Sequence, residues 1–143
     1  MKKLALIFLI GVIVIVGIAY MYLNYKANYY EAKRENNQFE SYLNQEFYGA
    51  DVVTLINKAY DNNLTNQVEK DKEGKFVEND NNSIKIDIKM TDTDTVYDME
   101  TLYAGGMDTF VKYYNTIKFK CSKLEYHNST GKVKYLYIEQ ITE

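Results

Sequence analysis

Twenty consecutive uncharged residues, 4–23, follow directly behind Met1, Lys2 and Lys3. A stretch of this length matches one membrane-spanning helix, because a hydrocarbon core of about 30 Å needs roughly 20 residues at a rise of 1.5 Å each. A buried helix of a soluble protein rarely lacks a polar face over so many positions. The segment therefore predicts a chain that is held in a lipid bilayer through residues 4–23.

Two interpretations of this segment remain open, an uncleaved anchor and a cleaved signal peptide. The apolar run is longer than the roughly 7–15 residues of a signal-peptide core, and it continues past its only plausible cleavage site, at Gly17-Ile18-Ala19. Tyrosine rings sit well at headgroup level, and several tyrosines follow at the far end of the run. These are Tyr20, Tyr22, Tyr25, Tyr29 and Tyr30. We therefore favour the anchor.

The positive charges on the two sides of the segment are nearly balanced, so they favour neither orientation strongly. Lys2 and Lys3 precede it, while Lys26, Lys33 and Arg34 follow it. Two lysines before an apolar run are typical of an export signal. We therefore expect residues 1–3 in the cytoplasm and the C-terminal part outside it, as in a single-pass protein of the cell membrane.

The composition of residues 24–143 limits the function further. This part carries 15 of the 17 Lys and Arg residues and all 20 Asp and Glu residues, a net charge of −5. A nucleic-acid partner needs a basic face that neutralises phosphates, so we expect none. The length suits one domain, and the single cysteine excludes an internal disulfide and a CxxC motif. The absence of proline and the abundance of Asn, Lys and Tyr are typical of a low-GC bacterial genome.

Residues 24–48 are predicted to continue the membrane helix as a stalk, because no Gly or Pro occurs between Ile18 and Tyr48. One stripe recurs at steps of three and four residues, as on one face of a helix. Its members are Tyr22, Tyr25, Tyr29, Ala32, Asn36, Phe39 and Leu43. We expect this stripe to contact the chain's own domain. A coiled coil with a sister helix is the alternative.

Residues 49–143 predict an α+β domain with an antiparallel sheet and one or two packing helices. Helices are expected at 51–60 and 107–114, and strands at 67–70, 75–78, 84–90, 96–100, 118–126 and 132–140. The clearest strand is 84–90, where Ile84, Ile86 and Ile88 alternate with charged residues. We expect these three isoleucines to face the helix 51–60 through Val52, Leu55 and Ile56.

Asp92, Asp94 and Asp98 are the best candidates for a metal site, because calcium loops use Asp at alternate positions. A calcium loop that began at Asp92 would place Tyr97 where glycine is required and Tyr103 where the bidentate glutamate belongs. We therefore expect a solvated turn between two strands, with no metal ligand.

No residue pattern in the chain indicates catalysis or a cofactor. His127 is the only histidine, and it has no cysteine or second histidine nearby with which to form a zinc site or a nucleophilic triad. Cys121 lies in an alternating, strand-like segment and is expected to be a small buried side chain. The pair Gly105-Gly106 lacks the Gly-Lys-Ser/Thr of a phosphate loop. We expect a protein that is not an enzyme and binds no cofactor.

Four segments resemble a group of uncharacterised single-pass membrane-anchored proteins of clostridia-like Firmicutes. They read YGADVVTLINKA (48–59), NSIKI (82–86), YDME (97–100) and FKCSKLEYH (119–127). The resemblance implies a bacterial source and a membrane-anchored domain, and it implies no site residues. The layout also resembles type IV pilin-like proteins, although 1–11 lacks both the glycine cut site and the glutamate of a prepilin.

The leading hypothesis is a non-enzymatic, membrane-anchored extracytoplasmic module that interacts or assembles with other proteins of the bacterial envelope. A pilin-like structural subunit is one alternative. A small-ligand or ion-binding sensor, with Asp92 and Asp94 as its best candidates, is the other.

Overall fold

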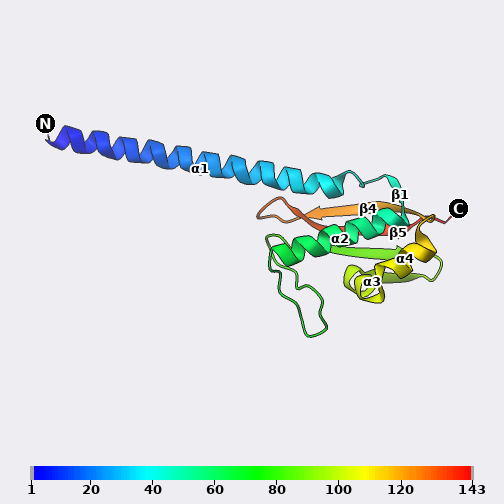
Figure 1. Ribbon diagram of the computed structural model, residues 1–143. Coiled ribbons are helices and arrows are strands. Elements are labelled where there is room, and N and C mark those ends of the chain that lie inside the picture. Colours follow the sequence, from blue (N-terminus) through cyan, green and yellow to red (C-terminus); the bar gives the residue numbers. More distant parts are fainter. Residues whose placement is uncertain (1, 143) are drawn as a thin grey trace.

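The computed structural model describes residues 2–142, so Met1 of the predicted cytoplasmic end and Glu143 lie outside the described residues. Its first element is one continuous helix, α1 (Lys2–Glu40). Figure 1 shows that most of α1 projects from the molecule as a rod, while its last turns lie beside the domain. None of its most apolar window is buried, and its length and composition are sufficient to cross a membrane. The helix is compatible with a membrane anchor or a signal sequence.

The helix α1 ends at Glu40, and the prediction that it continues to Tyr48 is wrong. Asn44 adopts a positive φ of 59°, and its N–H donates to the carbonyl oxygen of Cys121 at 2.9 Å. The chain then joins the edge of the sheet as β1 (Glu46–Tyr48). Pairing with a distant strand therefore overrides the local preference for helix.

The second helix, α2 (Gly49–Thr65), begins at a tight contact. A Cβ atom on Gly49 would lie 2.0 Å from the carbonyl oxygen of Tyr114, so only glycine fits there. Asp51 accepts a hydrogen bond from the N–H of Tyr48 at 3.1 Å, which stabilises the first turn. The helix is longer than the predicted 51–60.

The remaining strands are β2 (Lys85–Met90), β3 (Thr95–Asp98), β4 (Lys118–Tyr126) and β5 (Val133–Gln140). They form a five-stranded sheet with β1 in the order β1-β4-β5-β2-β3. The pairs β4–β5 and β2–β3 are antiparallel, as predicted, whereas β2 and β5 are parallel. The strand β1, which was not predicted, pairs antiparallel with β4. The sheet is therefore mixed, because the β4–β5 hairpin inserts β5 beside β2. The predicted α+β class is confirmed.

Two short helices connect β3 to β4. The helix α4 (Met107–Tyr114) has the predicted bounds, while α3 (Met99–Gly105) was not predicted. The strand expected at 96–100 ends at Asp98, whose carboxylate accepts a hydrogen bond from the N–H of Thr101 at 2.7 Å and so begins α3.

The hairpin expected from 67–70 and 75–78 is reduced to a single bridge between Lys70 and Phe76. Its turn contains Gly74 at a φ of +83°, the conformation for which a glycine is expected. No strand forms at either predicted segment among residues 2–142.

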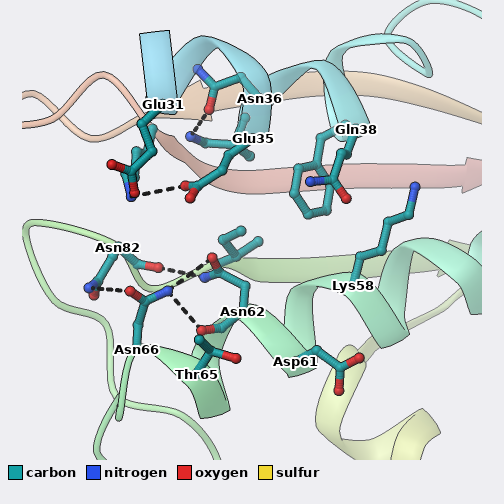
Figure 2. Close-up of a pocket in the computed structure, with 14 residues that line it drawn as sticks. Glu31, Glu35, Asn36, Gln38, Lys58, Asp61, Asn62, Thr65, Asn66 and Asn82 are labelled. Atoms are coloured by element: carbon teal, nitrogen blue, oxygen red, sulfur yellow. Dashed lines mark hydrogen bonds and ion pairs between the residues drawn. The ribbon is translucent and has the colours of Figure 1, made fainter. Parts of the chain in front are cut away.

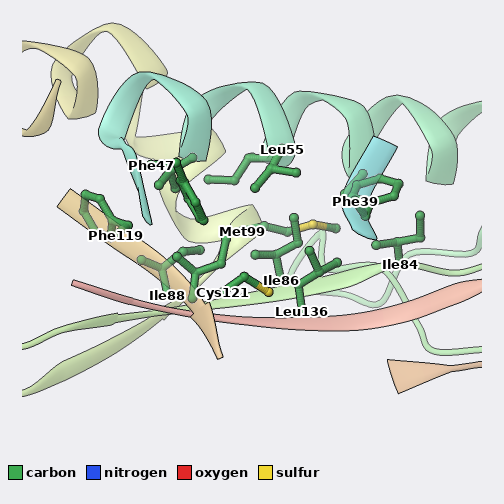
Figure 3. Close-up of a cluster of buried hydrophobic side chains, with 14 of the residues drawn as sticks. Phe39, Phe47, Leu55, Ile84, Ile86, Ile88, Met99, Phe119, Cys121 and Leu136 are labelled. Atoms are coloured by element: carbon green, nitrogen blue, oxygen red, sulfur yellow. The ribbon is translucent and has the colours of Figure 1, made fainter. Parts of the chain in front are cut away.

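The core lies between the sheet and the helices α2, α3 and α4, and Figure 3 shows its side chains in one layer. Ile84, Ile86 and Ile88 are buried there with Leu55 of α2, so the predicted register is confirmed. Phe39, near the end of α1, enters the same layer beside Ile84. The last turns of α1 are therefore part of the domain's core.

Candidate functional site

The contact between the stalk, residues 24–40 of α1, and the domain is built around one asparagine. The Nδ2 of Asn36 donates to the carbonyl oxygen of Gly131 at 2.8 Å, and its Oδ1 accepts from the N–H of Val133 at 2.8 Å. The side chain thus replaces a neighbouring strand at the start of β5. Asn36 lies in the predicted stripe between the buried Ala32 and Phe39, and the prediction that this stripe contacts the domain is confirmed for these three residues.

Charged groups surround this contact at the domain surface. The ammonium group of Lys132 lies 2.9 Å from the carboxylate of Glu35 and 3.6 Å from that of Glu31. The hydroxyl of Tyr126 donates to Glu40 at 2.9 Å. Burial and this neighbouring carboxylate raise the pKa of Tyr126 to about 12, so the phenol remains a donor at neutral pH. The stalk is therefore joined to the domain both directly before β5, through Lys132, and at the end of β4, through Tyr126.

A polar cavity of about 420 Å³ lies between the stalk and α2 (Figure 2). The amide of Asn62 donates to the carbonyl oxygen of Asn82 at 2.8 Å, and the amide of Asn82 donates to Asn66 at 3.2 Å. Lys58 and Asp61 also line the cavity, and within residues 2–142 neither side chain forms an ion pair or hydrogen bond. The cavity is thus polar and open, with one unpaired ammonium group and one unpaired carboxylate.

A second cavity of about 300 Å³ has mainly apolar walls and lies between α3, α4 and the ends of β2 and β3. Its side chains include Met90, Tyr97, Leu102, Phe110, Tyr113 and Tyr114. Tyr113 at its rim is 65 % exposed. An apolar cavity beside an exposed tyrosine is the kind of surface into which a side chain of another protein inserts.

The three aspartates of the predicted metal candidate do not converge. Asp94 pairs with Lys89, whereas Asp98 pairs with Lys75 at 2.8 Å and begins α3. Asp92 lies in the turn between β2 and β3, and this turn is exposed, as expected. No group of three or more His, Cys, Asp or Glu side chains within residues 2–142 has an arrangement suitable for a metal ion.

His127 and Cys121 both have structural roles. The Nε2 atom of His127 lies 2.8 Å from the carbonyl oxygen of Ser83, and because a carbonyl only accepts, Nε2 carries the proton. This bond joins the β4–β5 loop to the start of β2. The thiol of Cys121 is buried under α2, and burial raises its pKa, which disfavours the reactive thiolate.

Comparisons with protein-family models, with curated proteins and with solved structures found no match.

Sequence reasoning missed the structural role of Asn63. Asn63 is fully buried in α2, where its Nδ2 donates to the carbonyl oxygen of Ile84 and its Oδ1 accepts from the same residue's N–H, both at 2.8 Å. The predicted helix, 51–60, stops before this residue, whereas α2 continues to Thr65. The signal that was available is its position seven residues after Ile56, on the buried face of α2, at spacings of three and four.

Proposed function

We propose that this protein is a membrane-anchored extracytoplasmic module that interacts or assembles with other proteins of the bacterial envelope. The observation that carries the proposal is the continuity of α1, whose uncharged segment runs without interruption into a stalk that is fastened to the domain (Figure 1). A stalk with a buried asparagine and a core phenylalanine, Asn36 and Phe39, holds the domain at a fixed distance from the bilayer. Such a connection suits a domain that presents a surface to neighbours.

The proposed activity is binding to other proteins and not catalysis. His127 and Cys121 are the side chains whose residue types most often serve in catalysis, and both are buried and have structural roles. The cavity between α3 and α4 supports a protein partner, since interface anchors are apolar or aromatic side chains that fill such pockets. It lies at the end of the domain away from the projecting part of α1 (Figure 1), where a neighbour would have access.

Cysteine labelling of intact cells tests the sidedness of the domain. Cys121 is buried and gives little background, so new cysteines can be placed at Val77, an exposed loop position, and at Lys3. With a membrane-impermeant maleimide we expect Val77→Cys to be labelled in intact cells and Lys3→Cys only after lysis. The reverse pattern would place the domain in the cytoplasm.

Photo-crosslinking in living cells tests the partner surface. A crosslinking amino acid at Tyr113 should form a defined product with another envelope protein. The matched control is Lys120, an exposed position of β4 on the opposite face of the sheet, which should form none. Equal products from both positions, or none from Tyr113, would contradict the assignment of this surface.

A pilin-like structural subunit is the second candidate function. The specific observation is that α1 combines an unburied apolar half with last turns that pack on a sheet. Mass spectrometry of the mature protein separates the two candidates, because a pilin loses its leader before assembly. We expect an intact end with Lys2 and Lys3, and loss of this end would favour the pilin or a cleaved signal peptide.

A further inference from the structure

The patch formed by α3, α4 and the turn between β2 and β3 combines a recess with a protruding side chain. The recess is the cavity of about 300 Å³ between the two helices, whose walls are mainly apolar and include Met90, Leu102 and Phe110. Tyr113, on the rim of this recess, is 65 % exposed. An exposed aromatic side chain and an apolar pocket are the two components of an interface anchor. This patch therefore carries both components.

Such a patch is complementary to itself. In a two-fold dimer the same patch of both partners forms the contact, so residue i of one copy meets residue j of the other, and residue j meets residue i. A two-fold axis that passes beside the rim brings the Tyr113 ring of each copy to the recess of the other. This symmetry requires that a protruding side chain lies beside a recess of the kind it fills, as Tyr113 does.

The unpaired charges of the patch are complementary as well. The ammonium group of Lys112 lies 5.7 Å from the centroid of the Tyr113 ring, and within the described part of the chain it forms no ion pair or hydrogen bond. The same holds there for the carboxylate of Asp92, in the turn between β2 and β3. Burial and the negative charge of Asp92 raise the pKa of Tyr114, whose side chain lines the recess. A cation and an anion without partners therefore flank the same recess.

The other charged groups of this region are already compensated. Three carboxylates have partners within the chain: Asp94 with Lys89, Asp98 with Lys75, and Glu100 with the N–H of Phe76. Asp108 is exposed in the first turn of α4, where the positive end of the helix dipole stabilises a negative charge. Lys112 and Asp92 are thus the charges of the patch that gain most from a neighbour.

We propose that this patch binds a second copy of the chain in the same bilayer, with Tyr113 of each copy in the recess of the other and Lys112 of each copy against Asp92 of the other. The inference rests on the proposed function and names the neighbour of that surface as another molecule of this chain. Figure 1 shows α3 on the side of the domain opposite α1, so the two stalks do not obstruct the contact.

The membrane anchor is what makes so small a contact effective. Two buried tyrosine side chains account for about 300–500 Å². A stable interface between freely diffusing proteins needs roughly 1,200–2,000 Å². Confinement in one bilayer raises the effective concentration of the two copies, which favours association without any additional contact.

Energy transfer between copies tests the contact. The full chain carries a donor or an acceptor dye on a cysteine at Val77, an exposed loop position, and is reconstituted in phosphatidylcholine vesicles. Protection of the buried Cys121 thiol from maleimide verifies the fold of every variant. We expect transfer to rise with the protein-to-lipid ratio. Tyr113→Ser should need at least about a tenfold higher ratio for the same transfer, because it removes the central aromatic anchor.

Charge variants test the pairing across the two-fold axis. Lys112→Asp and Asp92→Lys each bring like charges together when a variant meets itself, so we expect either variant alone to need about a tenfold higher ratio. A mixture of the two variants restores both ion pairs and should approach the parent chain to within about threefold. Lys33→Asp, at an exposed position of the stalk, is the matched control and should leave the transfer unchanged.

Several results would overturn the inference. These are equal transfer in Tyr113→Ser and the parent chain, a mixture no better than its separate variants, or an effect of Lys33→Asp as large as that of Lys112→Asp, which would assign the association to the stalks. Photo-crosslinking at Tyr113 separates the inference from the proposed function. A product with the mass of two chains supports both, a product with a different protein and no transfer between copies refutes the second copy alone, and no product contradicts both.

Discussion

Replacement of Asn36 by alanine should separate the stalk from the domain at a measurable energetic cost. The change removes two hydrogen bonds of 2.8 Å and leaves the N–H of Val133, a residue that is 1 % exposed, without a partner. A lost hydrogen bond costs about 1 kcal/mol, and an unsatisfied buried group costs about 1–3 kcal/mol. The carbonyl of Gly131 is near solvent and can bind water, so its penalty is smaller. We expect Asn36→Ala to lower the free energy of unfolding by about 2–4 kcal/mol, a large part of the stability of a small domain.

Asn37→Ala is the matched control for this prediction. Asn37 is the next residue of the same helix, it is exposed, and it gains the same helix propensity on replacement, about 0.7 kcal/mol at most. Urea unfolding of the full chain in detergent micelles, followed by the near-ultraviolet circular dichroism of its tyrosines, compares the two variants. Hydrogen exchange at the Val133 amide reports the local effect. Equal urea midpoints and an equally protected Val133 amide in both variants would refute the role assigned to Asn36.

Four further predictions concern the domain. Ile86→Ala, in the core, should cost about 2–5 kcal/mol in urea unfolding, whereas Lys85→Ala, on an exposed position, should change stability by less than about 0.5 kcal/mol. Gly49→Ala should prevent stable folding, seen as lost thermal cooperativity, because its Cβ would lie 2.0 Å from a backbone oxygen at the end of α4. The thiol of Cys121 should react with maleimide only after unfolding; rapid labelling of the folded chain would contradict its burial. Burial raises the pKa of Glu100 above its ordinary 4.5, so its contribution to stability is complete below about pH 4.5 and is lost as the pH rises through the folded-state pKa. Glu100→Gln should remove this slope from unfolding curves measured between about pH 4 and 7.

The hydrophobic pattern of the sequence predicted the elements whose buried face is set by residues a few positions apart. The alternation of Ile84, Ile86 and Ile88 identified the buried face of β2, because successive side chains of a strand point to opposite faces. The helix α4 and the strand β4 have their predicted bounds for the same reason, since each presents one apolar side over a short stretch. The uncharged segment 4–23 likewise required no knowledge of the rest of the chain.

The candidate site was predicted less completely, because its contacts join distant parts of the chain. The stripe that contains Asn36 was identified, but its partner Gly131 lies 95 positions away, and no pattern near Asn36 indicates that bond. The predicted helix 51–60 stops before Asn63, whereas α2 continues to Thr65 and the amide of Asn63 binds the backbone of Ile84, 21 positions away. The two cavities exist only where α1 meets α2 and where α3 meets α4, so they had no counterpart in the sequence.

The sequence by itself determined that this chain carries one uncharged segment long enough to span a bilayer and an α+β domain with an alternating central strand. Only the tertiary structure decided that α1 ends at Glu40, that β5 lies parallel to β2, and that two asparagines fasten helices to strands. The physical reason is the separation in sequence between the residues that define each feature. A hydrophobic pattern is set by residues a few positions apart, whereas strand order and side-chain-to-backbone hydrogen bonds depend on which distant segments the folded chain brings together.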